Sequence, residues 1–219
     1  MASLRWKIAQ YFEKRWWKNY LGKQEPGGYM LWKTNYWNGL LTQINEWVVP
    51  DASGRYLDMG CGPAGIFMVL LGKVTAVDPL LDSYKKQAFH FKPETFGNVT
   101  FMAVRAEDFI CDEPFDIVFS MNVINHVTDI SQAVTTLYSC CKPGGKLVIS
   151  VDAHNFSFLR TIFRYLHFDI LHPHQLMLTE YKKLLEKEGL VISGDKCLKK
   201  GNIFSYHVLV VQKPETVSS

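Results

Sequence analysis

The chain has 219 residues, of which 47% are hydrophobic and 14% aromatic, enough for the core of one large domain. Its net charge of +3 is too small to require a nucleic-acid partner. The five cysteines include no Cys-x-x-Cys pair, which argues against a disulfide framework or a zinc module and favours a reducing, cytoplasmic location.

The first 49 residues are predicted to be helical. Hydrophobic residues recur every four positions from Leu4 to Tyr20 and form one stripe, which ends at Gly22 and the turn at residues 26–28. A second helix is expected over residues 29–48, before Pro50. Residues 1–33 hold seven Lys or Arg but only two acids, so this segment either meets an anionic partner or has a basic solvent face.

From residue 50 onward, short strands alternate with helices, which predicts a doubly wound parallel sheet. The expected strands are 55–59, 74–77, 99–104, 115–120, 146–151, 191–198 and 203–211, and the expected helices are 64–71, 81–91, 130–141 and 178–188. Because only a few residues join the last two strands, these two must pair antiparallel. We therefore expect an α/β fold whose mostly parallel, seven-stranded sheet has a final antiparallel strand. A cap insertion is expected at 152–177 and a loose tail at 214–219.

A glycine-rich turn follows the first of these strands. Gly60-Cys61-Gly62-Pro63-Ala64-Gly65 lets the backbone approach a ligand closely and matches the Gly-x-Gly-x-x-Gly pattern of dinucleotide-binding folds. A match of this kind also fits a tight strand-to-helix turn that binds nothing. The turn alone therefore marks a candidate ligand site without naming the ligand.

Two acidic residues narrow the choice of ligand. Asp58 and Asp78 end the first two strands, so both carboxylates are expected at the same edge of the parallel sheet. Asp78 is suited to accept hydrogen bonds from a ribose diol. Asp58 would repel a pyrophosphate, whereas it would attract a cationic amino-acid group.

The order of these motifs resembles the class I S-adenosylmethionine-dependent methyltransferases. Asp58-x-Gly60-x-Gly62 resembles the first motif of that family, and Asp78 resembles its ribose-binding acid. The segments 115–127 and 142–145 resemble its fourth strand with the following loop and its turn into the fifth strand. Ala64 departs from the common third glycine, and Arg105-Ala106-Glu107 replaces the usual Asp-Ala pair at adenine.

The resemblance implies S-adenosylmethionine as cofactor, a small-molecule acceptor, and N-terminal helices (residues 1–49) that form a lid over the domain at 50–213. The residues expected to bind the cofactor are Asp58, Gly60, Cys61, Gly62, Asp78, Pro79, Ala106, Glu107, Asn122, Tyr29 and Trp37. Asn125, His172 and Trp17 are expected to contact the acceptor. No metal is expected, because asparagines stand where acidic ligands would be needed.

Histidines are the candidate bases. His126 lies in the loop after the fourth strand, next to the expected position of the reactive methyl group, and a histidine suits proton removal near neutral pH. His154 and His174, like His172, follow the fifth strand and could orient the acceptor or act as base. Equally, each of these side chains could cap a helix end or bond to the backbone.

The aromatic, basic first helix could also touch an anionic membrane surface and collect a lipid-like substrate. No apolar run approaches the roughly 18 residues of a membrane span. Two other hypotheses on the function of the whole chain remain.

An NAD-dependent oxidoreductase would share the glycine-rich turn and Asp78, but this hypothesis does not explain Asp58 or the final hairpin. A non-catalytic binding protein with the same fold is also compatible with the sequence.

Overall fold

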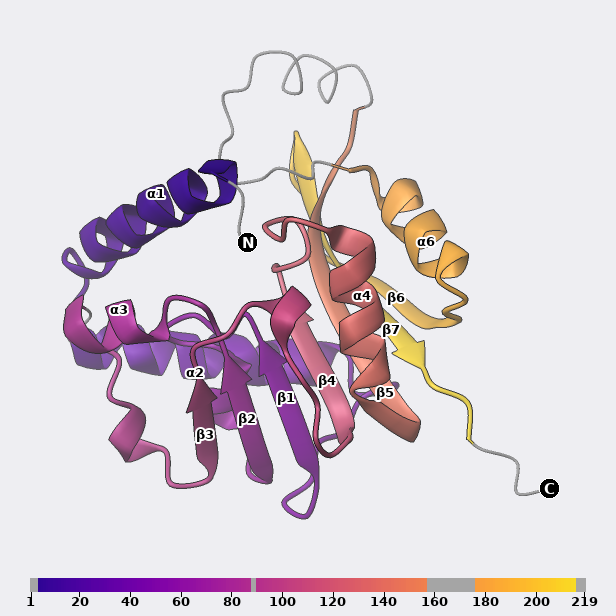
Figure 1. Cartoon of the computed structure of the whole chain (residues 1–219), viewed down its shortest axis with the longest axis horizontal. Coiled ribbons are helices and arrows are strands. Elements are labelled where there is room, and N and C mark those ends of the chain that lie inside the picture. Colours follow the sequence, from indigo (N-terminus) through magenta and orange to yellow (C-terminus); the bar gives the residue numbers. More distant parts are fainter. Residues whose placement is uncertain (1–3, 88–89, 157–175, 216–219) are drawn as a thin grey trace.

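The structure, a computed structural model, describes residues 4–87, 90–156 and 176–215. Seven strands form one sheet in the order β3-β2-β1-β4-β5-β7-β6 (Figure 1). Their bounds are β1 (Arg55–Met59), β2 (Lys73–Val77), β3 (Val99–Met102), β4 (Phe115–Met121), β5 (Cys141–His154), β6 (Ile192–Lys199) and β7 (Phe204–Gln212). The five neighbouring strands β3, β2, β1, β4 and β5 pair in parallel. Strand β7 lies between β5 and β6 and pairs antiparallel with both. The predicted sheet with its final antiparallel strand is therefore confirmed.

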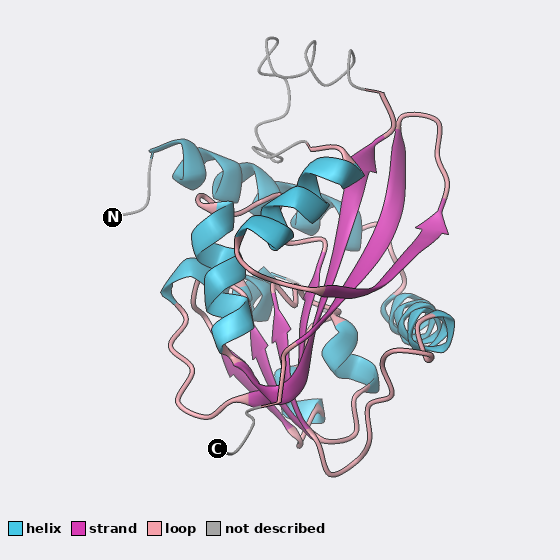
Figure 2. Ribbon diagram, turned by 90° about the vertical axis from the view of Figure 1, so that its right-hand side faces the viewer, coloured by secondary structure: helices cyan, strands magenta, loops and turns pink. Residues whose placement is uncertain are grey.

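Helices cover both faces of this twisted sheet (Figures 1 and 2). The helices are α1 (Leu4–Leu21), α2 (Pro26–Gln43), α3 (Leu81–Gln87), α4 (Ile130–Ser139) and α6 (Leu178–Lys187). Side chains of α2 belong to one hydrophobic core, and those of α4 and α6 belong to the other. Within the strands, neighbours such as Tyr56 and Leu57 alternate between the two cores, as the two-residue period of a strand requires.

The second helix differs from its predicted bounds at both ends. It begins at Pro26, which suits the first turn of a helix because the ring fixes φ and no donor is lost. The Glu25 side chain accepts hydrogen bonds from the backbone N–H groups of Gly27 and Gly28 and so caps the helix. The helix ends at Gln43 rather than at residue 48.

The helix predicted over residues 64–71 is wrong: only a 3-10 turn, η1 (Ile66–Val69), forms there. A Cβ atom on Gly72 would lie 2.1 Å from the Gly54 carbonyl oxygen, so the chain is already close against the start of β1 at that point. Few residues are left between the glycine-rich turn and β2. The apolar residues of this segment favour a helix locally. The short connection between β1 and β2 instead limits the segment to a 3-10 turn.

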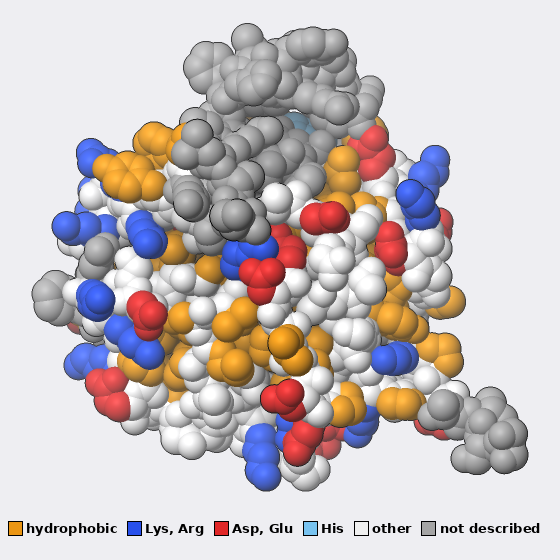
Figure 3. Space-filling view, in the orientation of Figure 1, with side chains coloured by type: hydrophobic (Ala, Val, Ile, Leu, Met, Phe, Trp, Pro, Cys, Tyr) orange, Lys and Arg blue, Asp and Glu red, His pale blue; other side chains and the backbone are white. Residues whose placement is uncertain are grey.

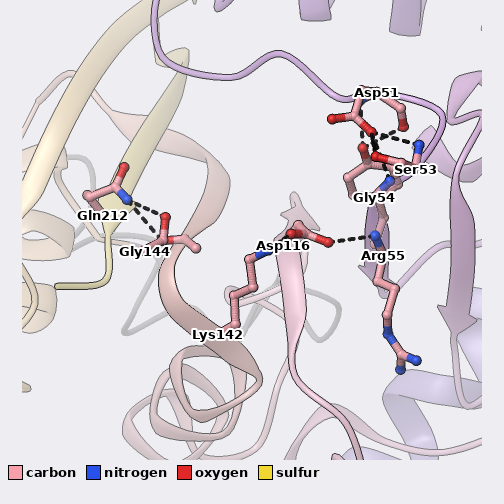
Figure 4. A network of polar contacts seen from close by, with 10 residues as sticks. Asp51, Ser53, Gly54, Arg55, Asp116, Lys142, Gly144 and Gln212 are labelled. Atoms are coloured by element: carbon pink, nitrogen blue, oxygen red, sulfur yellow. Dashed lines mark hydrogen bonds and ion pairs between the residues drawn. The ribbon is translucent and has the colours of Figure 1, made fainter. Parts of the chain in front are cut away.

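Polar contacts join the strands at the edge of the sheet opposite the glycine-rich turn (Figure 4). The backbone N–H of Arg55 donates to the Asp116 carboxylate at 2.7 Å, and Lys142 forms an ion pair with the same carboxylate. The Gln212 side chain donates to the carbonyl oxygen of Gly144. These contacts fix the amino-terminal ends of β1, β4 and β5.

Candidate active site

A cavity of about 1030 Å³ lies at the carboxyl ends of the strands, and residues of α1 and α2 contribute to its lining. Its lining includes the glycine-rich turn, the residues that follow β2 and β4, and the near ends of β5, β6 and β7. Cavities at this edge of a doubly wound sheet are the usual ligand sites of such folds. The volume is at the upper end of the range for small-molecule pockets.

Asp58 is the most deeply buried acid of the cavity, with 1% of its surface exposed. Its Oδ2 accepts a hydrogen bond of 3.0 Å from the backbone N–H of Phe67 in the turn. Burial raises the pKa of Asp58 to about 7, although the N–H of Phe67 and the nearby Lys33 act in the opposite direction. A cationic ligand would stabilise the ionised form of this carboxylate and so offset the cost of burying it.

The glycines of the turn are required by its shape. Gly60 has φ +72°, and a Cβ atom on it would lie 2.3 Å from the side chain of Val123. Gly62 has φ +56°, a conformation that favours glycine even where space is open. Gly65 has no such φ, but a Cβ atom on it would lie 2.4 Å from the Asp58 carboxylate. Glycine at these positions lets the backbone close around the carboxylate and leaves the cavity open.

Asp78 lies at the end of β2, with 6% of its surface exposed. Its Oδ1 accepts from the Leu80 N–H at 2.8 Å and its Oδ2 from the Gly62 N–H at 3.0 Å. Burial raises its pKa to about 6. Because a carboxylate has about four lone-pair positions, two can still accept hydrogen bonds from a ligand.

Lys33 of α2 lines the cavity beside Asp58, and sequence reasoning did not single it out. Its Nζ lies 4.4 Å from the ring centre of Trp37 and 5.1 Å from that of Tyr36. Burial lowers the pKa of Lys33 to about 8, against the attraction of Asp58. The indole N–H of Trp37 donates to the carbonyl oxygen of Ala64 at 2.9 Å, which ties α2 to the glycine-rich turn.

The loop after β4 carries a backbone conformation that is rare outside glycine. Asn122 has φ +60°, its N–H donates to the Ser150 carbonyl oxygen at 3.0 Å, and it lines the cavity. Its buried side-chain oxygen finds no hydrogen-bond partner among the described residues. Strained conformations of this kind concentrate at functional sites. Ala106 and Glu107 also line the cavity, and the Glu107 carboxylate accepts from the Thr128 N–H at 2.7 Å.

Hydroxyl groups gather at the end of the cavity nearest β5 and β7. The Tyr206 hydroxyl lies 2.6 Å from Ser150 Oγ, and Tyr36, which interacts electrostatically with Tyr206, lines the same cavity. Burial raises the pKa of Tyr206 well above its ordinary value, so this phenol stays protonated. Asp152 lines the same end. The sequence did not reveal this group, because α2, β5 and β7 are far apart along the chain.

The structure brings most of the predicted site residues together. The cavity lining contains Asp58, Gly60, Cys61, Gly62, Asp78, Pro79, Ala106, Glu107, Asn122, Trp17, Trp37 and His126. His172 and His174 lie outside the described residues, as do most of the expected cap at 152–177 and residues 216–219 of the expected tail.

Three predicted site residues are placed away from the lining of the cavity. Tyr29 is buried, with its ring centre 5.3 Å from that of His90. His154 is 3% exposed and lies against Phe204, with ring centres 4.3 Å apart. Asn125 is buried, and its side-chain oxygen finds no hydrogen-bond partner within the described part of the chain. Of the predicted histidines in the described ranges, His126 is therefore the one that reaches the cavity.

The sheet order, the acidic strand ends and the glycine-rich turn define a Rossmann-like fold with a ligand site at its carboxyl edge. The family described as "Methyltransferase domain" matches residues 25–193, so the chain belongs to that family. The ubiquinone biosynthesis O-methyltransferase of Rickettsia akari is 28% identical over 151 residues, 59% of this chain and 60% of that protein. The chain spans 41–60% of the length of such curated relatives.

Solved structures share the fold. A SAM-dependent methyltransferase of Methanosarcina mazei is 20% identical with a TM-score of 0.62, covering 79% of this chain and 97% of that one. The N-methyltransferase NodS of Bradyrhizobium japonicum, solved with S-adenosyl-L-homocysteine, is 17% identical with a TM-score of 0.59, covering 80% and 84%. At these identities the likeness concerns the fold, and the reaction must be argued from the site.

Proposed function

We propose that the chain is an S-adenosylmethionine-dependent methyltransferase that acts on a hydroxyl group of a small, hydrophobic acceptor. The observation that carries this proposal is a pair of opposite charges beside the glycine-rich turn, the buried Asp58 and the partly exposed Lys33, both of which line the cavity. An amino-acid group carries both a cation and an anion and complements such a pair. A pyrophosphate would meet the Asp58 carboxylate, which disfavours the NAD-dependent alternative.

Residues of the cavity can bind the amino-acid group and the ribose of the cofactor. Asp58 receives the ammonium group, and Lys33 pairs with the carboxylate of the methionine moiety. Asp78 accepts from the ribose diol through its remaining lone-pair positions. The bound cofactor supplies an already activated methyl group, so the protein need only orient a nucleophile in line with it and manage one proton. The relative NodS, with its bound S-adenosyl-L-homocysteine, supports this choice of cofactor.

The acceptor occupies the end of the cavity where the hydroxyl groups gather. Tyr206 and Tyr36 orient its reacting hydroxyl, and the half-exposed Trp16 and Trp32 add apolar surface at the rim of the cavity. An oxygen acceptor is supported by the curated relatives, which are O-methyltransferases. His126 removes the proton of the acceptor hydroxyl as the methyl group is transferred. His172 remains a predicted acceptor contact, and His174 a predicted catalytic residue.

Calorimetric titration can test the cofactor site with ligands that differ in one part. S-adenosylhomocysteine should bind, and NAD should not. Lys33→Met should weaken S-adenosylhomocysteine binding by about 10- to 100-fold, the loss of one charge-assisted hydrogen bond. Binding of 5′-methylthioadenosine should be unchanged, because it lacks the amino-acid group. Lys199→Met is the matched control, since Lys199 lines the cavity from β6 and should leave both affinities unchanged.

Two results would contradict the proposed cofactor site. One is tight NAD binding without S-adenosylhomocysteine binding. The other is a Lys33→Met variant whose affinities for S-adenosylhomocysteine and for 5′-methylthioadenosine fall by the same factor. That result would place Lys33 away from the amino-acid group. The acceptor can then be sought by measuring S-adenosylhomocysteine formation with small phenols and catechols, compared with the matched anilines.

A further inference from the structure

The middle of the hydrophobic stripe of α1, from Ile8 to Trp16, faces outward instead of into the core. Ile8, Tyr11, Phe12 and Trp16 are 40%, 61%, 44% and 49% exposed. A helix of a globular protein normally buries its apolar stripe. In α1 this exposed part of the stripe is not what attaches the helix to the domain.

A different face of α1 holds it in place. Leu21 is 2% exposed, and Trp17 contacts Tyr84 edge to face with ring centres 6.1 Å apart. Successive helical residues are turned by about 100°, so Trp17 and Trp16 point in clearly different directions. The packing of Trp17 and Leu21 therefore leaves the stripe on the outside.

Basic residues lie beside the stripe on the outer side of the helix. Lys14, Arg15 and Lys18 are exposed, and residues 1–33 carry seven Lys or Arg against two acids. In the shared orientation of Figures 1 and 3, hydrophobic and basic side chains lie together over the part of the surface that α1 occupies. We call the exposed residues Ile8, Tyr11, Phe12, Lys14, Arg15, Trp16 and Lys18 the α1 surface.

We propose that the α1 surface docks the protein on an anionic lipid bilayer. Trp, Tyr and Phe side chains insert at the boundary between headgroups and acyl chains, and Lys and Arg attract anionic headgroups. Among the described residues, no helix is long and apolar enough to cross a membrane, so α1 would lie along the surface. A second copy of the chain is a poorer occupant, because a symmetric contact through α1 would bring the same basic residues together.

The α1 surface adjoins the rim of the cavity. Trp16, which is half exposed, also lines the cavity, as do Gln10 and Glu13 of the same helix. Trp32 of α2 is 52% exposed and lines it too. Docking through α1 would therefore place this rim close to the lipid. If the proposed function holds, a hydrophobic acceptor could then enter from the bilayer, but docking itself does not depend on that function.

Co-sedimentation with vesicles tests the proposal. The full chain should sediment with vesicles of phosphatidylglycerol and phosphatidylcholine, and much less with phosphatidylcholine alone. Replacing Lys14 and Arg15 together by Gln should weaken binding by about 30-fold, as expected for two basic residues near an anionic surface. Its matched control replaces Lys183 and Lys187, exposed on α6, by Gln and should bind as the parent does.

A second pair of variants tests the apolar contribution. The double change Tyr11→Ser and Phe12→Ser should reduce binding at least tenfold. The control Ile110→Ser and Val191→Ser removes two side chains that are 79% and 68% exposed elsewhere and should not reduce it. Neither Tyr11 nor Phe12 lines the cavity, so binding of S-adenosylhomocysteine should be unchanged and reports that the variant is folded.

Three outcomes would overturn the proposal. The first is the absence of binding to anionic vesicles. The second is an equal loss of vesicle binding in the α1 variants and in their controls. The third is a dimer in sedimentation velocity that the Tyr11 and Phe12 changes dissociate, which would show that a second copy covers the α1 surface.

Discussion

Replacing Asp58 by Asn should stabilise the ligand-free protein while it impairs cofactor binding. The folded pKa of about 7 lies about 3 above the ordinary value of 3.8. Since one pKa unit corresponds to about 1.4 kcal/mol, burying the ionised carboxylate costs about 4 kcal/mol at pH 8. An amide avoids this cost and can still accept the hydrogen bond from Phe67. This cost already includes the attraction of Lys33. Part of the gain is lost because the buried amide of Asn brings N–H donors that must leave water, so we expect a net gain of about 2 kcal/mol.

Chemical unfolding of the ligand-free protein at several pH values measures this gain. The folded pKa is raised, so the wild-type protein loses stability as pH rises from about 4 to about 7, and the variant does not lose this contribution. The advantage of Asp58→Asn should be near zero at pH 4 and complete above pH 7. For a domain of this size, about 2 kcal/mol corresponds to a rise in Tm of about 4–8 °C. S-adenosylhomocysteine should bind about 10- to 100-fold more weakly.

Asp82→Asn is the matched control, because the Asp82 side chain on α3 is 75% exposed and should affect neither property. Equal stability of the Asp58 variant and the wild type at pH 8 would refute the reasoning about burial. A stability gain with unchanged cofactor affinity would refute the assignment of Asp58 to the ammonium group.

Other properties of the site give measurable outcomes as well. Gly60→Ala should lower the free energy of unfolding by about 1–3 kcal/mol in denaturant titrations, because of its positive φ and the contact with Val123; an unchanged value would contradict the turn geometry. His126→Ala should lower kcat by about 100-fold and leave the affinity for S-adenosylhomocysteine unchanged; unchanged turnover would remove its role as base. Cofactor affinity should be highest between pH 7 and 8, because Asp58 must be ionised and Lys33 protonated; calorimetry that shows a monotonic pH dependence would contradict this pairing.

Local patterns were sufficient for most of the fold. The strand predicted at 55–59 matches β1 residue for residue, because Gly54 and Gly60 bound this short segment. The hairpin of β6 and β7 followed from the short connection alone. The helix predicted at 64–71 failed because the connection between β1 and β2 is a tertiary constraint that local composition does not express.

The candidate site was predictable where residues occupy strand ends. Asp58 and Asp78 could be placed because parallel strands bring their carboxyl ends to one edge. Lys33 and Tyr206 were missed, since their approach to the cavity depends on how α2 and β7 pack. His154 shows the same limit: β5 continues through this residue and pairs it with Phe204 of β7, which holds the ring against a neighbouring strand.

A crystal structure of the complex with S-adenosylhomocysteine would test the central claim most directly. We predict the ammonium group at Asp58, the carboxylate at Lys33 and the ribose at Asp78, with the sulfur atom turned toward His126 and Tyr206. A ligand bound outside the cavity, or one whose amino-acid group lies away from both Asp58 and Lys33, would contradict the account.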